Sequence, residues 1–131
     1  TKEFAVNLAN YRYWSEREQF YFDEILFQNE EHAGSSMRWN AAMVGDMHRI
    51  ICRGGIFLYP ADSRKTSRNG KIRLLYEANP LAMLVENSGG RATSLGQKIL
   101  DIQPESLHQR VPVALGSKEQ VDEYNKVTLK L

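Results

Sequence analysis

The sequence predicts an α/β domain of three layers, in which helices cover both faces of a mixed β-sheet. The main observation is that apolar stripes of helical period alternate along the chain with short apolar runs typical of buried strands. The second is size, because 131 residues, 42% of them apolar and 25% charged, suit one globular core. We therefore expect a single domain over residues 1–131.

The first quarter of the chain predicts one strand and one helix. Phe4 to Asn7 is a short strand-like run. Ser15 with Glu18 is a capping box, in which each side chain satisfies a free backbone N–H of the first helical turn, so a helix is predicted at about Glu16 to Gln28. Polar and acidic residues from Asn29 to Ser36 predict a loop.

The next stretch predicts a helix followed by a buried strand. Asn40 to Arg53 carries apolar residues at helical spacing, and cations near its end favour the negative end of the helix dipole. Gly54 and the glycine after it predict where this helix stops. Ile56 to Tyr59 is an apolar run closed by a proline, which predicts a strand.

A hairpin signal precedes the third predicted strand. Asn69-Gly70 is typical of a tight turn, so the run Lys71 to Tyr76 is predicted to pair antiparallel with Ile56 to Tyr59. Pro80, suited to a first helical turn, predicts a helix that Gly89 and Gly90 end.

The C-terminal part predicts short strands and a final helix. Arg91 to Thr93, Ile99 to Ile102 and Val111 to Leu115 are the strand candidates. Ser117 with Gln120 is interpreted as a capping box that opens a helix reaching about Lys130.

Three charged residues share one face of the predicted strand Lys71 to Tyr76. Side chains alternate along a strand, so Lys71, Arg73 and Glu77 would point the same way, with Lys71 and Glu77 about 13 Å apart if the chain stays extended. Two cations and one acid across that span could hold an anion at one end and a metal ion at the other. The pattern suggests a phosphorylated ligand and a divalent cation, without naming an enzyme.

Composition argues against several other classes of protein. The formal net charge is +1, and the cation-rich loop Asp62 to Arg73 lacks interleaved aromatic residues, so nucleic-acid binding is not expected. No apolar run approaches 18 residues and the first residues, TKEFAVN, show no signal-peptide pattern, so no membrane contact is expected. One cysteine excludes an internal disulfide and fits a reducing compartment.

Five ordered blocks of the sequence carry a specific resemblance. They are MRWNAAMVGDMHRII (Met37 to Ile51), GGIFLYPAD (Gly54 to Asp62), GKIRLLYEANPLA (Gly70 to Ala82), SGGRAT (Ser88 to Thr93) and LDIQPESLHQRVPVALGS (Leu100 to Ser117). The chain resembles the C-terminal part of class I fructose-1,6-bisphosphatase in its bacterial form. That family's carboxylate-rich metal motif, of Asp-Pro-x-Asp-Gly-Ser type, does not occur in these 131 residues. The resemblance therefore implies a sugar-phosphate-binding C-terminal domain without its N-terminal metal-motif domain.

The resemblance also implies roles for six residues. Asn7 and Tyr59 match residues of the pocket for the sugar's distal phosphate, and Lys71 matches a lysine that contacts the sugar phosphate in the active site. Arg73 matches an arginine near the phosphate that is removed. Each has a structural alternative: a solvated charge for Lys71, a rim ion pair for Arg73, and a core aromatic for Tyr59. A tyrosine of the family falls on Asn10 here, and Tyr11 could replace it after a one-residue slip, which the sequence does not decide.

The two remaining residues concern assembly and metal. Arg38 matches an arginine that reaches the neighbouring subunit's active site, which implies a homo-oligomer, a tetramer in the intact protein; Trp39 stands where many members have tyrosine. The alternative for Arg38 and Trp39 is a surface cation–π contact. Glu77 matches a ligand of Mg²⁺, whose site other residues outside this chain must complete; its alternative is an acid favoured at a helix N-terminus.

The implied reaction is metal-dependent hydrolysis of the 1-phosphate of D-fructose 1,6-bisphosphate, giving fructose 6-phosphate and phosphate, in cytoplasmic gluconeogenesis. We expect this chain alone to be inactive, with its own N-terminal domain as the missing partner. Two alternatives stay open: sedoheptulose 1,7-bisphosphate as substrate, or a non-catalytic module for phosphate binding or assembly.

Overall fold

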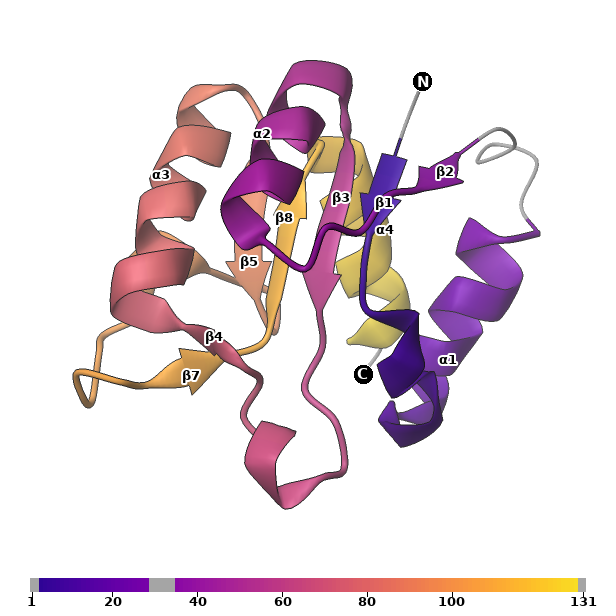
Figure 1. The fold of residues 1–131 in the computed structure, drawn as a ribbon, viewed down its shortest axis with the longest axis horizontal. Helices are drawn as coiled ribbons and strands as arrows, with labels where there is room; N and C mark the ends of the chain where they lie inside the picture. Colours follow the sequence, from indigo (N-terminus) through magenta and orange to yellow (C-terminus); the bar gives the residue numbers. More distant parts are fainter. Residues whose placement is uncertain (1–2, 29–34, 130–131) are drawn as a thin grey trace.

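A computed structural model describes residues 3–28 and 35–129, which form one sheet between two helical layers (Figure 1). The strand order in this sheet is β2 (Ser36–Met37), β1 (Glu3–Ala5), β3 (Gly55–Tyr59), β8 (Val113–Gly116), β5 (Arg91–Ser94) and β6 (Gln97–Lys98). The β2–β1 and β1–β3 pairs are parallel, whereas β3–β8, β8–β5 and β5–β6 are antiparallel. The sheet is mixed, as the sequence predicts.

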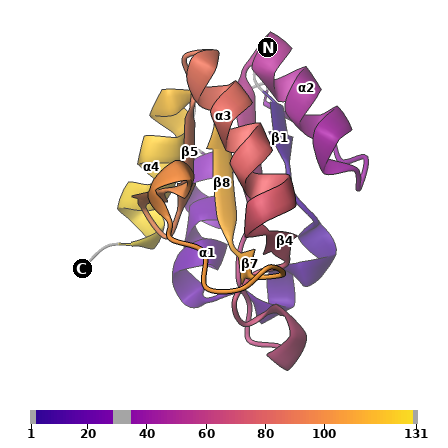
Figure 2. The same cartoon turned by 90° about the vertical axis from the view of Figure 1, so that its left-hand side faces the viewer.

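Alternation along β3 builds a core on each face of the sheet. Phe57 packs in the cluster that includes α2 (Met43–Arg53) and α3 (Asn79–Asn87). Its neighbours Ile56 and Leu58 pack in the opposite cluster, with α4 (Lys118–Thr128) and the N-terminal helical segment. Figure 2 shows α4 on one side of β5 and β8, and α2 and α3 on the other. The three-layer prediction is confirmed.

The N-terminal segment follows the sequence prediction closely. A 3₁₀ helix η1 (Leu8–Tyr13) leads into α1 (Glu16–Phe20), which continues as a π-helix η2 (Tyr21–Leu26). Ser15 Oγ accepts a hydrogen bond from Glu18 N at 3.2 Å, which confirms half of the predicted capping box, while the Glu18 carboxylate accepts from the Tyr124 hydroxyl instead. Of the predicted loop 29–36, residues 29–34 lie outside the described residues, and Ser36 already belongs to β2.

Glycines end α2 and allow the paired strands β1, β3 and β8 to approach closely at that point. Gly54 ends α2 with a φ of 83°, a left-handed conformation that glycine adopts without strain. A Cβ on Gly55 would lie 2.0 Å from the backbone oxygen of Glu3, and one on Gly116 would lie 2.2 Å from the backbone oxygen of Gly55. Only glycine fits at these two strand positions.

The predicted strand Lys71 to Tyr76 is largely wrong. Only β4 (Ile72–Arg73) is extended, and it pairs antiparallel with β7 (Arg110–Val111) in a separate two-stranded sheet rather than with β3. From Leu74 the chain turns into a π-helix η5 (Leu74–Ala78) that runs on into α3, with Leu74 and Ala78 buried. Burial of these two residues, four apart on one helical face, favours the helix over the strand.

Three predictions in the C-terminal part need correction. Pro112 splits the predicted strand into β7 and β8, and β6 is followed by a 3₁₀ helix η6 (Ile99–Asp101) where a strand was expected. Ser117 Oγ accepts from Gly55 N at 3.0 Å instead of capping α4, and no side-chain atom of Gln120 finds a partner among the described residues. None of the helices within residues 3–28 and 35–129 combines the length and apolarity that crossing a membrane requires.

Candidate functional site

Three predicted site positions follow parallel strands that end at the same edge of the sheet. The pairing of β1 with β3 ends at Ala5 and Phe57, and Asn7 and Tyr59 each lie two residues beyond this last pair. β2 pairs with the other side of β1, and the next residue, Arg38, donates its backbone N–H to Phe4 O at 3.0 Å. The carboxyl ends of parallel strands are a usual place for ligand sites in α/β sheets.

An aromatic stack lines this edge on the α2 side. The ring of Trp39 stacks on Phe57 at 5.9 Å and lies 6.3 Å from the ring of Tyr59. Trp39 and Tyr59 are both half-buried and pack against the core on this side. The expected alternative for Trp39, a surface cation–π contact with Arg38, is therefore wrong, because Trp39 packs on β3 instead.

A charged group that the sequence reasoning missed lies just beyond β3. The buried carboxylate of Asp62 accepts from Arg64 Nη2 at 2.6 Å and from Arg64 Nε at 3.2 Å, and the Arg64 guanidinium lies 4.4 Å from the centre of the Tyr13 ring. The hydrogen bonds from Arg64 lower the pKa of Asp62, with a smaller contribution from the charge of Lys71. The charge of Lys71 therefore acts on Asp62. Lys71 is exposed, so its ammonium group is accessible to a ligand.

Arg73 and Glu77 contact each other directly instead of standing apart on a strand. Arg73 Nη1 lies 3.5 Å from Glu77 Oε1, and Arg73 N donates to the same oxygen at 3.1 Å. The prediction that Lys71, Arg73 and Glu77 share one face of an extended strand is wrong, because η5 begins at Leu74 and brings Glu77 back over Arg73. The cation and the acid are partly exposed, so both remain accessible to a ligand.

The segment 105–111 fastens the turn that carries Arg73 and Glu77. Leu74 N donates to Gln109 O at 2.8 Å, and the hydroxyl of Tyr76 lies 2.8 Å from Nδ1 of His108. The rings of Tyr76 and His108 also meet edge to face at 5.8 Å. Neither contact could be found from the sequence, because the partners are more than thirty positions apart and no local pattern links them.

Asn7 and its neighbours have defined partners at the start of η1. Asn7 Oδ1 accepts from Ala9 N at 3.1 Å and so caps this helix, while Asn10 is buried. The hydroxyl of Tyr11 donates to Asp23 Oδ2 at 2.6 Å, and this hydrogen bond raises the pKa of Tyr11. Tyr11 is thus engaged with η2, and not with the edge formed by Asn7 and Tyr59.

Arg38 is separate from the other predicted residues. It is exposed and lines a cavity of about 400 Å³ together with Glu3, Ser36 and Arg53. Glu3 is buried and accepts from both Arg49 and Arg53, so the acid in this cavity is already neutralised. Within this chain, the side chain of Arg38 therefore has no anionic partner among the described residues.

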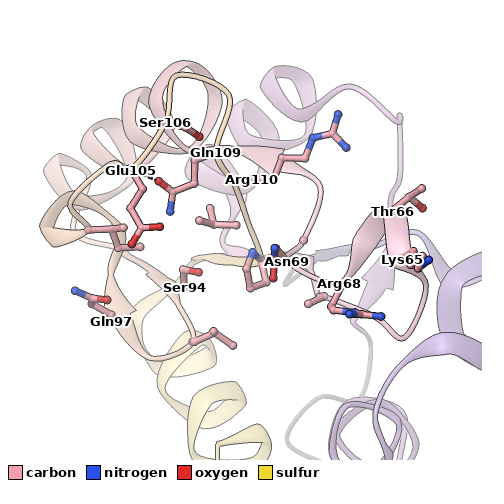
Figure 3. Close-up of a pocket in the computed structure, with 16 residues that line it drawn as sticks. Lys65, Thr66, Arg68, Asn69, Ser94, Gln97, Glu105, Ser106, Gln109 and Arg110 are labelled. Carbon is pink, nitrogen blue, oxygen red and sulfur yellow. Dashed lines mark hydrogen bonds between the residues drawn. The ribbon is translucent and has the colours of Figure 1, made fainter.

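A large cavity lies next to the candidate site without including its predicted residues. It measures about 700 Å³ and is lined by the loop around η4 (Lys65–Ser67), by the β5–β6 turn and by residues 102–112 (Figure 3). None of the six predicted residues lines it. Across residues 3–28 and 35–129, no three His, Cys, Asp or Glu side chains gather where they could hold a metal ion, so Glu77 is at most one ligand of a larger site.

Comparisons with known proteins agree on one family. Residues 1–129 match the family described as "Fructose-1-6-bisphosphatase, C-terminal domain". The chain is 65% identical over 125 residues to a class 1 fructose-1,6-bisphosphatase of Pseudoalteromonas translucida (strain TAC 125), which covers 95% of the chain and 38% of that relative. It is 56% identical over 124 residues to the class 1 enzyme of Cellvibrio japonicus (strain Ueda107), covering 93% of the chain and again 38% of the relative.

Solved structures show the same relation. The crystal structure of Leishmania major fructose-1,6-bisphosphatase in holo form matches with a TM-score of 0.86 and 40% identity, over 95% of this chain and 38% of that one. The T-state structure of the same protein matches with a TM-score of 0.87 and 40% identity. The chain thus spans well under half of the length of the relatives it matches.

Proposed function

Since the chain belongs to the fructose-1,6-bisphosphatase C-terminal domain family, we propose that it is the sugar-phosphate-binding domain of an enzyme that removes the 1-phosphate of D-fructose 1,6-bisphosphate. The products are fructose 6-phosphate and phosphate, and the reaction serves gluconeogenesis in the cytoplasm. The observation that carries this proposal is the group of exposed or half-exposed charges Lys71, Arg73 and Glu77 around the β4–η5 turn.

The distal phosphate of the sugar is held by neutral donors and one ammonium. Tyr59 has its ring against the core and can offer its hydroxyl at the strand end, and Asn7 follows the neighbouring strand β1 with its amide nitrogen available as a donor. Lys71 supplies a point charge suited to phosphate. Arg73, with a planar guanidinium, suits the phosphate that leaves.

Glu77 is the residue that can hold Mg²⁺ in this chain. A hard cation of this kind takes oxygen ligands and needs more than one carboxylate, so the remaining ligands come from an N-terminal domain outside residues 1–131. The metal would polarise the phosphoryl group and activate water. In this arrangement the present chain binds and orients the sugar, which lowers the barrier by positioning.

Arg38 acts in a second copy of the protein. Its exposure, and the lack of an anionic partner for it among the described residues, support a role across a subunit contact, in a homo-oligomer that we propose is a tetramer. An arginine reaching from a neighbour would add bidentate recognition of phosphate.

The test is an assay of phosphate release by the full-length protein and by residues 1–131 alone, with fructose 1,6-bisphosphate and with sedoheptulose 1,7-bisphosphate. We expect magnesium-dependent release by the full-length protein, with the higher kcat/KM for the fructose substrate, and none by the shorter chain. No release by the full-length protein would overturn the proposed reaction, whereas turnover by the short chain would overturn the assigned need for a second domain.

A further inference from the structure

The two-stranded sheet β4–β7 places two arginines side by side. Its register pairs Ile72 with Val111 and Arg73 with Arg110. Residues directly opposite in an antiparallel pair project to the same face, with Cβ atoms about 4.5–5.5 Å apart. Ile72 and Val111 are both buried in the core, so the alternate residues Arg73 and Arg110 face outward together.

The charges of these two arginines are not balanced. Glu77 pairs with Arg73 at 3.5 Å, but Arg110 has no ion pair or hydrogen bond from its side chain to any of the described residues, and it is exposed. Arg110 lines the cavity of about 700 Å³, and Figure 3 shows its side chain pointing away from Glu105 and Gln109, which line the same cavity. The positive charge of Arg110 is therefore unbalanced, and it lies directly opposite the positive charge of Arg73. Like charges at such opposite positions destabilise a strand pair.

An anion seated between the two guanidinium groups would remove this repulsion. In the described part of the chain, five of the ten arginines have a carboxylate partner, namely Arg49, Arg53, Arg64, Arg73 and Arg91. Of the other five, Arg110 is the one that lies opposite another arginine across a strand pair. Arg110 lacks such a carboxylate partner although its strand is fixed by the buried pair beside it. Two parallel guanidinium forks are well suited to the oxygens of a phosphoryl group.

We propose that Arg110 is a phosphate-binding residue that acts with its cross-strand neighbour Arg73, and that together they hold the phosphate released in the reaction. This inference rests on the proposed function for the identity of the phosphate, but not for the existence of the anion site. Arg73 and Lys71 lie two residues apart on the segment that Arg110 pairs with, so Arg110 extends the cationic group of the candidate site across the ribbon.

Two measurements on the full-length protein test the proposal, with Arg110→Met keeping much of the apolar stem and Arg17→Met as the control. Arg17 is an exposed arginine of α1, on the opposite face of the sheet, so its replacement changes the charge equally. The first measurement is the inhibition constant of inorganic phosphate as product. Losing charge-assisted hydrogen bonds should raise this constant roughly 10- to 100-fold in Arg110→Met and leave it unchanged in the control.

The second measurement is the melting temperature with and without inorganic phosphate. Without phosphate, Arg110→Met should melt at or above the wild-type temperature, because the repulsion with Arg73 is gone, and phosphate should stabilise it less than the wild type. An unchanged phosphate inhibition constant, an equal melting shift with phosphate, or a lower melting temperature without phosphate would each overturn the proposal. If the full-length protein fails to hydrolyse the sugar bisphosphate, the proposed reaction fails, and the melting shift still decides the role of Arg110.

Discussion

Two charged clusters of this molecule have similar residues and opposite character. In the β1–α2 cluster, the buried acids Glu3 and Asp46 have side chains only 4% and 0% exposed, and both are bonded to Arg49. In the β4–β7 cluster, the side chains of Arg73 and Glu77 are 41% and 32% exposed, and Arg110 has no partner among the described residues. A cluster that is buried and fully paired stabilises the fold, whereas an exposed one with surplus charge is available to a ligand.

Removal of an acid from the β1–α2 cluster gives the largest expected effect on stability. Asp46 accepts from Arg49 Nη2 at 3.0 Å and from Asn40 N at 3.2 Å. Asp46→Ala removes a buried carboxylate that accepts from both donors and leaves Glu3 as the remaining acid on Arg49, which should lower the free energy of unfolding by about 3 kcal/mol. Urea unfolding measures this, with Glu77→Ala as the comparison, for which less than about 1 kcal/mol is expected because the pair is exposed. Equal losses in the two variants would erase the distinction between the clusters.

A third acid, Glu18, extends the comparison because no paired cation among the described residues offsets its burial. Burial raises the pKa of Glu18 to about 7, although the hydrogen bond donated by the Tyr124 hydroxyl at 2.7 Å opposes this rise. Burial also acts to raise the pKa of Glu3, but hydrogen bonds from Arg53 and Arg49 outweigh it and hold that pKa below the usual value. The same residue type thus titrates in opposite directions in the two places.

The pH dependence of unfolding follows from these directions. A folded pKa above the unfolded value means that the contribution of Glu18 is complete below about pH 4.5 and is lost as the pH rises through 7. Glu3 behaves in the reverse sense, and its contribution is lost only as the pH falls below its usual range. In the wild type, this effect of Glu18 should lower the free energy of unfolding by about 2 kcal/mol between pH 5 and pH 8, and Glu18→Gln should remove that decrease. Unfolding curves at both pH values check this, and an unchanged slope in the variant would contradict it.

The smallest expected effect concerns the contact between Tyr76 and His108. This hydrogen bond ties segment 105–111 to the turn that carries Arg73 and Glu77. His108→Ala and Tyr76→Phe should each lower kcat/KM of the full-length protein roughly 3-fold, with the double variant no worse than either, because they break one bond. Additive losses in the double variant would show that the two side chains act independently.

Local signals in the sequence predicted most helix ends and the central strand. Ser15 and Gly54 act within a few residues of their own position, and the structure places a helix boundary beside each, whereas Pro80 lies in a helical segment that already begins at Leu74. The continuous apolar run Ile56 to Tyr59, closed by Pro60, likewise predicted the strand that lies between the two cores. These elements depend on residues that are neighbours in the chain.

The errors arose where distant residues decide. The run after Gly70 has apolar residues that suit a strand or a helix, and the pairing of β4 with β7, nearly forty residues away, ends the strand at Arg73. Ser117 has a helix-capping position in the sequence, but its hydroxyl is used by Gly55 on β3. The candidate site shows the same limit: its residue types follow from the sequence, but the Arg73–Glu77 contact and the Arg110 neighbour come only from the fold.

The most direct test of the account is to replace Lys71 by methionine in the full-length protein and to measure substrate kinetics and unfolding together. Lys71 is exposed and lies two residues before Arg73 of the β4–β7 cluster, which has surplus positive charge. The account therefore predicts a KM at least about 10-fold higher, with the free energy of unfolding changed by less than about 0.5 kcal/mol. An unchanged KM, or a loss of stability as large as that of Asp46→Ala, would contradict the claim that Lys71 and the β4–β7 cluster bind phosphate.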